Sequence, residues 1–202
     1  MFVRRFAEPD TPALYDVCLR TADAGGDATH LHHEPSLPGH VWLGPYLALE
    51  PELAWVVDDG NGRALGYVVG AVDTVAFEES RERSWWPELR MLYPESTKRS
   101  GTLTEADEGL VRTIHHPYPP RRQILEDHPS HLHIDLLPEA QGAGFGRVLI
   151  DTIGAALARR GSRGVYVGVA PANTPALAFY RKVAFVDLLA EEGVVWLGRR
   201  LA

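Results

Sequence analysis

The chain has 202 residues, is 45% hydrophobic, which is ample for one globular core, and carries a formal net charge of −7, which disfavours general nucleic-acid binding. Its single cysteine, Cys18, excludes an internal disulfide, suits a reducing cytoplasm and is expected in a helix core. No apolar run approaches the roughly 20 residues of a membrane span and the N-terminus lacks a signal-peptide core, so we expect a cytoplasmic protein without a membrane partner.

The first third of the chain predicts strands and helices that end in a β-hairpin. Asp58-Asp59-Gly60-Asn61-Gly62 is a turn sequence between two apolar runs, and such a pattern is typical of paired antiparallel strands. Residues 30–41 fit no regular pattern. The expected elements are a strand at 2–6, a helix from 11 to about 23, helical structure at 42–49, and strands at 53–57 and 64–72.

Residues 75–130 form a long stretch with one predictable helix, from Thr104 to His116. Thr104 and Asp107 resemble a capping box at its start. Loops of this length are usually functional or disordered. The tryptophans in Trp85-Trp86-Pro87 favour an ordered lid.

Residues 131–147 carry the most informative pattern in the chain. An alternating strand, with Leu132, Ile134 and Leu136 on one face, runs into Pro138 and then into a glycine-rich turn that opens a helix. The start of such a helix presents free N–H groups and the positive end of the helix dipole. The glycine-rich turn and the helix start together predict a binding site for a pyrophosphate.

The glycine spacing argues against two other phosphate-binding loops. Gln141, Gly144 and Gly146 fit the pattern Q/R-x-x-G-x-G/A. A P-loop requires Gly-Lys-Ser/Thr at its end, whereas Gly146 precedes Arg147 and Val148. A dinucleotide-binding loop requires G-x-G-x-x-G and a later acidic residue at a spacing this chain lacks.

The remainder of the chain predicts two further helix–strand units. Asn173-Thr174-Pro175 is typical of a helix start, with Asn173 as the N-cap. The expected elements are a helix from 144 to 160, a strand at 165–169, a helix from 174 to about 185, and a closing strand at 194–197.

At this point the chain resembles the GNAT family of acyl-CoA-dependent N-acetyltransferases. Gln141-Gly142-Ala143-Gly144-Phe145-Gly146 resembles the family's motif A, and the run from Asn173 through Phe179 and Tyr180 to Phe185 is similar to its motif B. The family usually has glycine before that last aromatic, where this chain has Ala184.

A narrower resemblance covers most of residues 1–200. Leu43-Gly44-Pro45-Tyr46, the segment 49–54, the strand sequence 66–74 and the segment 131–138 look like the acetyltransferase-like C-terminal domain of O-GlcNAcase and its free-standing bacterial relatives.

The resemblance implies a single-domain GNAT fold over residues 1–202. This is an α/β (α+β) architecture, a mixed, strongly twisted sheet flanked by helices, with a V-shaped splay where acetyl-CoA enters. A roughly fifty-residue insertion (75–130) precedes the motif A strand and is a candidate lid on the acceptor side. Acetyl-CoA is the implied co-substrate, without a metal. The implied cofactor-binding residues are Leu136, Leu137, Gln141, Gly142, Ala143, Gly144, Phe145, Gly146, Arg147, Asn173, Phe179 and Tyr180.

Two side chains are candidates for proton transfer. The resemblance implies that Tyr180 is the acid that protonates the leaving thiolate. Asp135 is the candidate base, since a carboxylate on an apolar strand is expected to have a raised pKa. Asp135 could instead be a structural acceptor for backbone or for His133. His133, another residue or water is an alternative base.

Other polar residues have less specific interpretations. His30, His32, His33 and Glu34 lack convincing metal-ligand spacing and are expected on the acceptor side or the surface. Asp73-Thr74 could face the acceptor cavity or cap a turn. Arg121-Arg122 is expected to be a solvated pair.

Three functions remain open at this point. The first is an acetyl-CoA-dependent N-acetyltransferase that acts by direct attack of a primary amine, either a small molecule or a lysine side chain. The second is an acetyl-CoA-binding module without turnover. The third is an interaction domain that uses the insertion. A homodimer is permitted by the edge near the last strand but not required.

Overall fold

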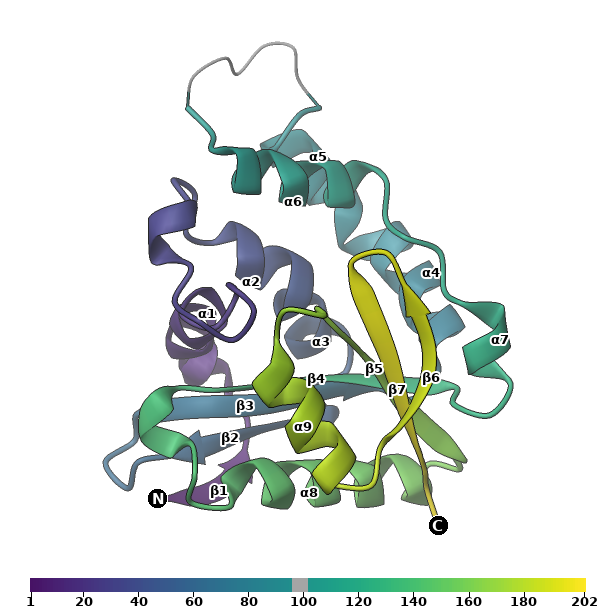
Figure 1. The fold of residues 1–202 in the computed structure, drawn as a ribbon. Coiled ribbons are helices and arrows are strands. Elements are labelled where there is room, and N and C mark those ends of the chain that lie inside the picture. Colours follow the sequence, from purple (N-terminus) through teal and green to yellow (C-terminus); the bar gives the residue numbers. More distant parts are fainter. Residues whose placement is uncertain (96–101) are drawn as a thin grey trace.

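A mixed seven-stranded sheet organises residues 1–95 and 102–202, which the computed structural model describes (Figure 1). Residues 96–101 belong to the insertion and lie outside the described residues. The strands are β1 Phe2–Arg5, β2 Ala54–Asp58, β3 Ala64–Ala71, β4 Ser130–Leu136, β5 Gly164–Val169, β6 Val186–Glu191 and β7 Val194–Arg200. The helices are α1 Thr11–Leu19, α2 Leu37–Trp42, α3 Gly44–Leu49, α4 Thr74–Ser84, α5 Trp86–Leu92, α6 Glu105–His115, α7 Arg122–Leu125, α8 Phe145–Arg159 and α9 Thr174–Lys182.

The centre of the sheet opens between β4 and β5. The strand order is β1-β2-β3-β4-β5-β7-β6, and β4 and β5 are the parallel neighbours. They pair only at Ser130 with Val165 and at His131 with Tyr166. Beyond these positions β4 continues to Leu136 and β5 to Val169 without pairing to each other. The predicted mixed, splayed sheet of the GNAT fold is therefore confirmed.

Helices cover both faces of this sheet. α8 packs against β1 to β4 on one face, and α1 and α3 pack against β3 on the other (Figure 1). Leu149, Ile153 and Leu157 of α8 are fully buried, as their helical spacing predicted. No helix in residues 1–95 or 102–202 is long and apolar enough to cross a membrane.

The described part of the insertion packs as ordered helices that share a second core with α2. α4 packs on α5, and α5 and α2 pack on α6. α6 begins with the predicted capping box between Thr104 and Asp107. The buried side chains of this second core are Leu37, Val41, Trp86, Leu89, Tyr93, Leu110, Val111 and Ile114.

A buried carboxylate ties the histidine-rich segment to α6. Asp107, which is 0% exposed, accepts from the His33 N–H at 3.0 Å and contacts His32 Nδ1 at 2.7 Å. The Thr104 N–H donates to it as well, at 3.1 Å. His33 lies on the surface, one of the two places expected for these histidines, whereas the His32 side chain, which is 5% exposed and outside both cavities, lies in neither. They dock the insertion onto the N-terminal half.

Several element boundaries differ from prediction for local reasons. The first helix stops at Leu19 because the Thr21 hydroxyl bonds back to the Val17 and Cys18 carbonyls. The predicted helix at 42–49 begins only at Gly44, because Leu43 leaves helical geometry before Gly44-Pro45, and α2 lies mostly in the stretch 30–41 that fitted no regular pattern. α4, α5, α7 and β6 were not predicted.

Candidate functional site

The glycine-rich loop leaves the start of α8 open. Gly142 and Gly144 have φ of +73° and +88°, a left-handed region that favours glycine. A Cβ at either position would meet no atom within 4 Å, so backbone conformation rather than crowding requires glycine there. Gly144 is the N-cap of α8 and no side-chain cap is present in the described structure. The first N–H groups of α8 are therefore available to an anion.

Side-chain contacts fix this loop against β4 and α9. The Gln141 amide Nε2 donates to the Leu136 carbonyl at 2.8 Å. Arg147 donates to the Lys182 carbonyl at 3.1 Å. A Cβ at Gly146 would lie 3.0 Å from the Phe179 ring, so glycine at this position lets α9 approach closely. The two motif regions singled out in the sequence thus lie together.

The end of β4 offers main-chain groups from alternate residues. The Leu137 N–H donates to Leu65 O, and its carbonyl accepts from Ala140 N, each at 2.9 Å. Leu137 therefore has no free main-chain group for an extended ligand. Because hydrogen bonding alternates along an antiparallel pair, the N–H groups of Ile134 and Leu136 point away from β3, toward the splay.

A cavity of about 440 Å³ lies in the splay beside α9; we call it the α9 cavity. It brings together Asp135 of β4 and Tyr180 of α9, the two candidates for proton transfer. Its other polar lining residues are Cys18, Thr21, Trp42, His133 and Asn173.

Asp135 is held by a buried tyrosine on the neighbouring strand. Tyr67, which is 0% exposed and pairs with Asp135 in the β3–β4 register, donates its hydroxyl to Asp135 Oδ2 at 2.5 Å. Burial raises the pKa of Asp135 to about 6, although the Tyr67 hydrogen bond opposes this shift. The structural acceptor role left open for Asp135 is thus realised with Tyr67, and not with His133.

Tyr180 is a buried hydroxyl at the same cavity. It is 4% exposed and packs against Phe179 and Phe185, with ring centroids 5.4 and 5.2 Å away. Burial and the charge of Asp135 raise the pKa of its hydroxyl. Tyr180 therefore keeps its proton at neutral pH and can donate it in a hydrogen bond.

Asn173 and Cys18 also line the α9 cavity. Asn173 Oδ1 accepts from the Ala176 N–H at 3.1 Å, which is the predicted N-cap. Cys18 is 2% exposed and burial raises the pKa of its thiol, so it is protonated and inert. This agrees with the expected place of Cys18 in a helix core.

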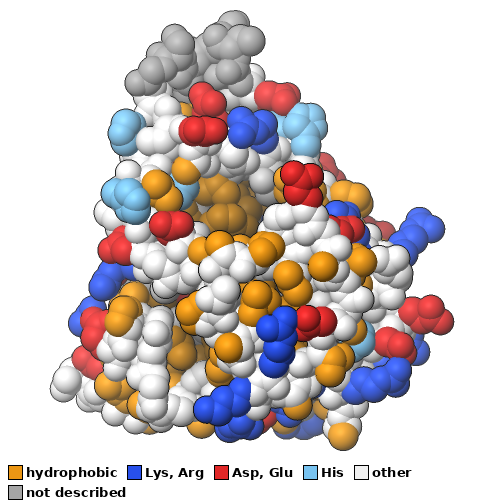
Figure 2. All heavy atoms as spheres, viewed as in Figure 1, with side chains coloured by type: hydrophobic (Ala, Val, Ile, Leu, Met, Phe, Trp, Pro, Cys, Tyr) orange, Lys and Arg blue, Asp and Glu red, His pale blue; other side chains and the backbone are white. Residues whose placement is uncertain are grey.

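A second cavity, of about 690 Å³, continues from the first one. We call it the strap cavity because the segment 117–121, the strap, forms one wall. Figure 2 shows a hollow lined by hydrophobic side chains in the upper half of the view. Both cavities share Trp42, His133, Val167, Gly168, Ala170, Gly193 and Val194. His133 thus lies at the junction, and burial lowers its pKa to about 4, so its ring is neutral.

A hydrogen-bonded histidine, His131, lines the strap cavity. The Thr74 hydroxyl donates to the Pro129 carbonyl at 2.8 Å, so it accepts from His131 Nδ1, also at 2.8 Å. His131 Nε2 then accepts from the Tyr46 hydroxyl at 2.7 Å. Asp73 caps α4 through Ala76 N, which confirms the capping alternative, and Thr74 lines the strap cavity.

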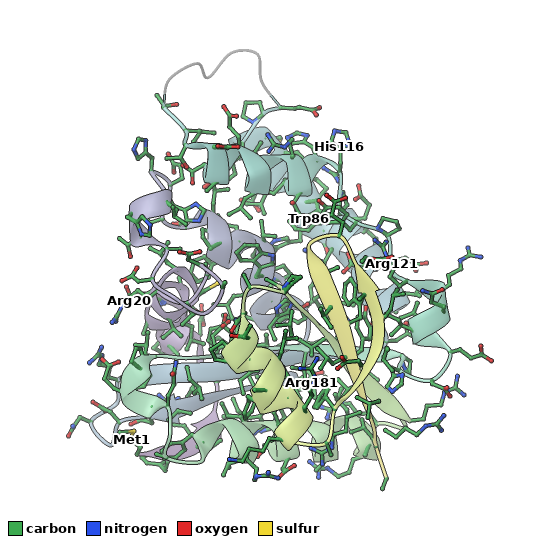
Figure 3. The ribbon with its side chains drawn as sticks, in the orientation of Figure 1. Met1, Arg20, Trp86, His116, Arg121 and Arg181 are labelled. Atoms are coloured by element: carbon green, nitrogen blue, oxygen red, sulfur yellow. The ribbon has the colours of Figure 1, made fainter. Side chains whose placement is uncertain are left out.

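An ion pair joins the strap to the β6–β7 hairpin. Arg121 Nε lies 2.8 Å from Glu191 Oε2, and the Trp196 indole N–H donates to the same oxygen at 3.2 Å. Figure 3 shows Arg121 beside this hairpin. The sequence predicted that Arg121 belongs to a solvated pair with Arg122. Arg121 is instead paired with Glu191 and lines the strap cavity.

Sequence reasoning missed Tyr67, Trp42 and Glu191 as members of the site. Tyr67 lies on a correctly predicted strand, but its partner Asp135 lies 68 positions away in sequence, beyond the insertion. Only the β3–β4 register brings the two together. Trp42 is the last residue of α2, a helix whose bounds were not predicted. Glu191 lies in β6, a strand that was not predicted.

Comparison with known proteins agrees with this geometry. A family model described as FR47-like protein matches residues 126–194, which include β4, the glycine loop and α9. SsHAT, a protein of known crystal structure, is 39% identical, with a TM-score of 0.90 over 100% of this chain and 98% of that chain. A GCN5-related N-acetyltransferase from Kribbella flavida is 16% identical, with a TM-score of 0.57 over 99% of this chain and 97% of its own, and shares the fold.

The splayed sheet and glycine loop therefore define an acetyltransferase fold. The chain belongs to the GCN5-related N-acetyltransferase (GNAT) family. The protein O-GlcNAcase of Rattus norvegicus and that of Mus musculus are each 26% identical over 205 residues, which is 98% of this chain. The chain spans 22% of the length of these curated relatives.

Proposed function

We propose that the protein is an acetyl-CoA-dependent N-acetyltransferase that transfers acetyl to a primary amine by direct attack, without an acyl-enzyme. One observation carries the proposal. Asp135 and Tyr180 line the same cavity, in the splay of β4 and β5 and beside an open helix N-terminus. A base and an acid on either side of one space are what this transfer requires.

Acetyl-CoA would be held mainly by main-chain groups. The N–H groups from Gly142 to Arg147 would bind the pyrophosphate, since the loop in front of them is open. The Leu136 N–H would pair with the extended arm, as an added strand does. Asn173 and Phe179 would contribute to the wall of the same groove. Acetyl-CoA supplies the activated acyl group, whose carbonyl carbon accepts the amine.

The protein's own groups would move two protons. Asp135, ionised above a pH of about 6, takes a proton from the attacking nitrogen as the C–N bond forms. An N–H of Ile134 or Leu136 stabilises the negative charge on the carbonyl oxygen. Tyr180 gives its proton to the sulfur as the C–S bond breaks, which releases free CoA and the amide. His133, at the junction of the cavities, is the alternative base.

The test combines titration calorimetry with a thiol assay. Acetyl-CoA and CoA are titrated into the protein, and free thiol is then followed while a panel of amines is added. The proposal predicts saturable binding and amine-dependent thiol release. Tyr180→Phe should slow release without loss of binding. Asp16→Asn, on the exposed side of α1 and outside both cavities, is the control. Binding without release across the panel would favour the binding module instead.

A further inference from the structure

The strap cavity has the composition of a binding site for a charged organic molecule. Its walls carry three carboxylates and two guanidinium groups, from Glu78, Arg81, Arg121, Glu191 and Glu192. They also carry aromatic side chains, among them Trp42, Tyr166 and Trp196. Its volume of about 690 Å³ lies in the range of small-molecule sites, about 300–1,000 Å³.

Both guanidinium groups already have carboxylate partners. Arg81 pairs with Glu78 at 2.7 Å, donates to the Val41 carbonyl at 3.2 Å and stacks on the Trp86 ring at 4.2 Å. Arg121 is bound to Glu191 and donates to the Pro119 carbonyl at 3.0 Å. Arg81 Nε is buried without a hydrogen-bond partner, so its remaining donor does not reach the open part of the cavity. A ligand carboxylate at either arginine would therefore compete with Glu78 or Glu191 for the guanidinium charge.

One carboxylate remains without a partner. Glu192, at the turn of the β6–β7 hairpin, has no hydrogen bond or ion pair within the described part of the chain. Its neighbour Gly193 lines both cavities. The three carboxylates and two guanidinium groups give the lining a net charge of −1. The unpaired carboxylate, Glu192, is next in sequence to a residue at the junction of the two cavities.

The fixed aromatic rings suit a cation on an apolar body. The Trp196 indole is held by Glu191, and Tyr166 packs on it with ring centroids 5.7 Å apart. Aromatic faces attract ammonium groups and pack against methylene chains. The strap, closed onto the hairpin by Arg121 and Glu191, favours a small molecule over a side chain of a folded protein.

We propose that the strap cavity binds small amines that carry a second positive charge on an apolar body, and that it disfavours amines that carry a carboxylate. This inference rests on the proposed function, because the bound amine is the acetyl acceptor only if the protein is an acetyltransferase. The positive far end would be bound by Glu192 and the aromatic faces, while the reacting amine lies at the junction near His133.

Three ligands of equal chain length test the charge preference directly. Hexane-1,6-diamine, hexylamine and 6-aminohexanoate carry a positive, neutral and negative far end on the same chain. Each is titrated calorimetrically into the protein saturated with CoA, so that no reaction occurs. We expect the diamine to bind most tightly and 6-aminohexanoate least, with about a tenfold span that narrows as salt rises.

A pair of glutamate variants locates the effect. Glu192→Gln should remove most of the preference for the diamine over hexylamine and leave hexylamine binding unchanged. Glu8→Gln, which removes an exposed carboxylate outside both cavities, should leave the order intact.

The outcomes separate this inference from the proposed function. Equal or tighter binding of 6-aminohexanoate, or no binding of any of the three ligands, overturns the inference. The expected order of binding without thiol release from acetyl-CoA would support the charge preference and refute the transfer.

Discussion

Tyr67→Phe tests whether the buried hydroxyl sets the pKa of Asp135. The substitution removes the donor at 2.5 Å from Asp135 Oδ2 and leaves the ring in a fully buried position. Because the hydroxyl stabilises the ionised carboxylate, its loss should raise the pKa of Asp135 further.

The size of the shift follows from the strength of that bond. A hydrogen bond to a charged group contributes about 1.5–3 kcal/mol, which corresponds to about one to two pKa units. Starting from about 6, the pKa of Asp135 would rise to between about 7 and 8. The ionised fraction at pH 7, and the rate with it, would then fall about two- to tenfold.

The assay is the pH dependence of kcat/KM for amine-dependent thiol release. Tyr67→Phe should move the acidic limb upward and approach the wild-type rate near pH 9, with acetyl-CoA affinity unchanged. Tyr15→Phe, which removes a hydroxyl that contacts His40 outside both cavities, should leave the profile in place. An equal loss of activity at every pH would refute the assignment of Tyr67 as the residue that positions and tunes the base.

Three further substitutions test separate parts of the account. Asp135→Asn should abolish turnover and leave acetyl-CoA affinity nearly intact. Since the folded-state pKa is raised from 3.8 to about 6, the carboxylate destabilises the fold above pH 6 and this cost vanishes as the pH falls below about 4. Urea unfolding at pH 8 should therefore show Asp135→Asn to be more stable than wild type, by at most about 3 kcal/mol, and a less stable variant would contradict this. Gly144→Ala should weaken acetyl-CoA binding several-fold and destabilise the protein by about 1–2 kcal/mol. Gly161→Ala, at a similar φ of +86° but at the other end of α8, should destabilise the protein equally without changing its affinity for acetyl-CoA. Equal affinities of the two variants for acetyl-CoA would refute the anion-binding site at the start of α8. Asp107→Ala should lower the free energy of unfolding by about 1–3 kcal/mol because it removes the acceptor of the His33 N–H and the partner of the buried His32 ring, and a loss below about 0.5 kcal/mol would show that the insertion docks by other contacts.

The parts of the fold that were predictable depend on residues near one another in sequence. Gly144 and Asn173 end up at the helix starts that their local chemistry predicts. The capping box of α6 and the turn at 58–62 follow from four or five consecutive residues. Gln141, Gly144 and Gly146, which follow an apolar strand in sequence, were therefore enough to predict that the glycine-rich loop lies at the end of β4.

The parts that were missed lack such a local signal. α4 buries only Thr74 and Phe77, so its sequence has no apolar stripe at helical spacing. β6 is an edge strand with mostly exposed or half-buried side chains, and an alternating pattern is absent. The pairs Tyr67–Asp135 and Arg121–Glu191 each join residues about 70 positions apart, and only tertiary packing sets their register.

The most direct test of the central claim is product analysis with a single acceptor. Wild-type protein, acetyl-CoA and hexane-1,6-diamine are mixed, and the acetylated amine and free CoA are quantified together by mass spectrometry, with Asp135→Asn in parallel. The account predicts equal amounts of the two products from wild type, no acetylated protein, and neither product above background from the variant. Thiol release without acetylated amine, or undiminished product from Asp135→Asn, would contradict it.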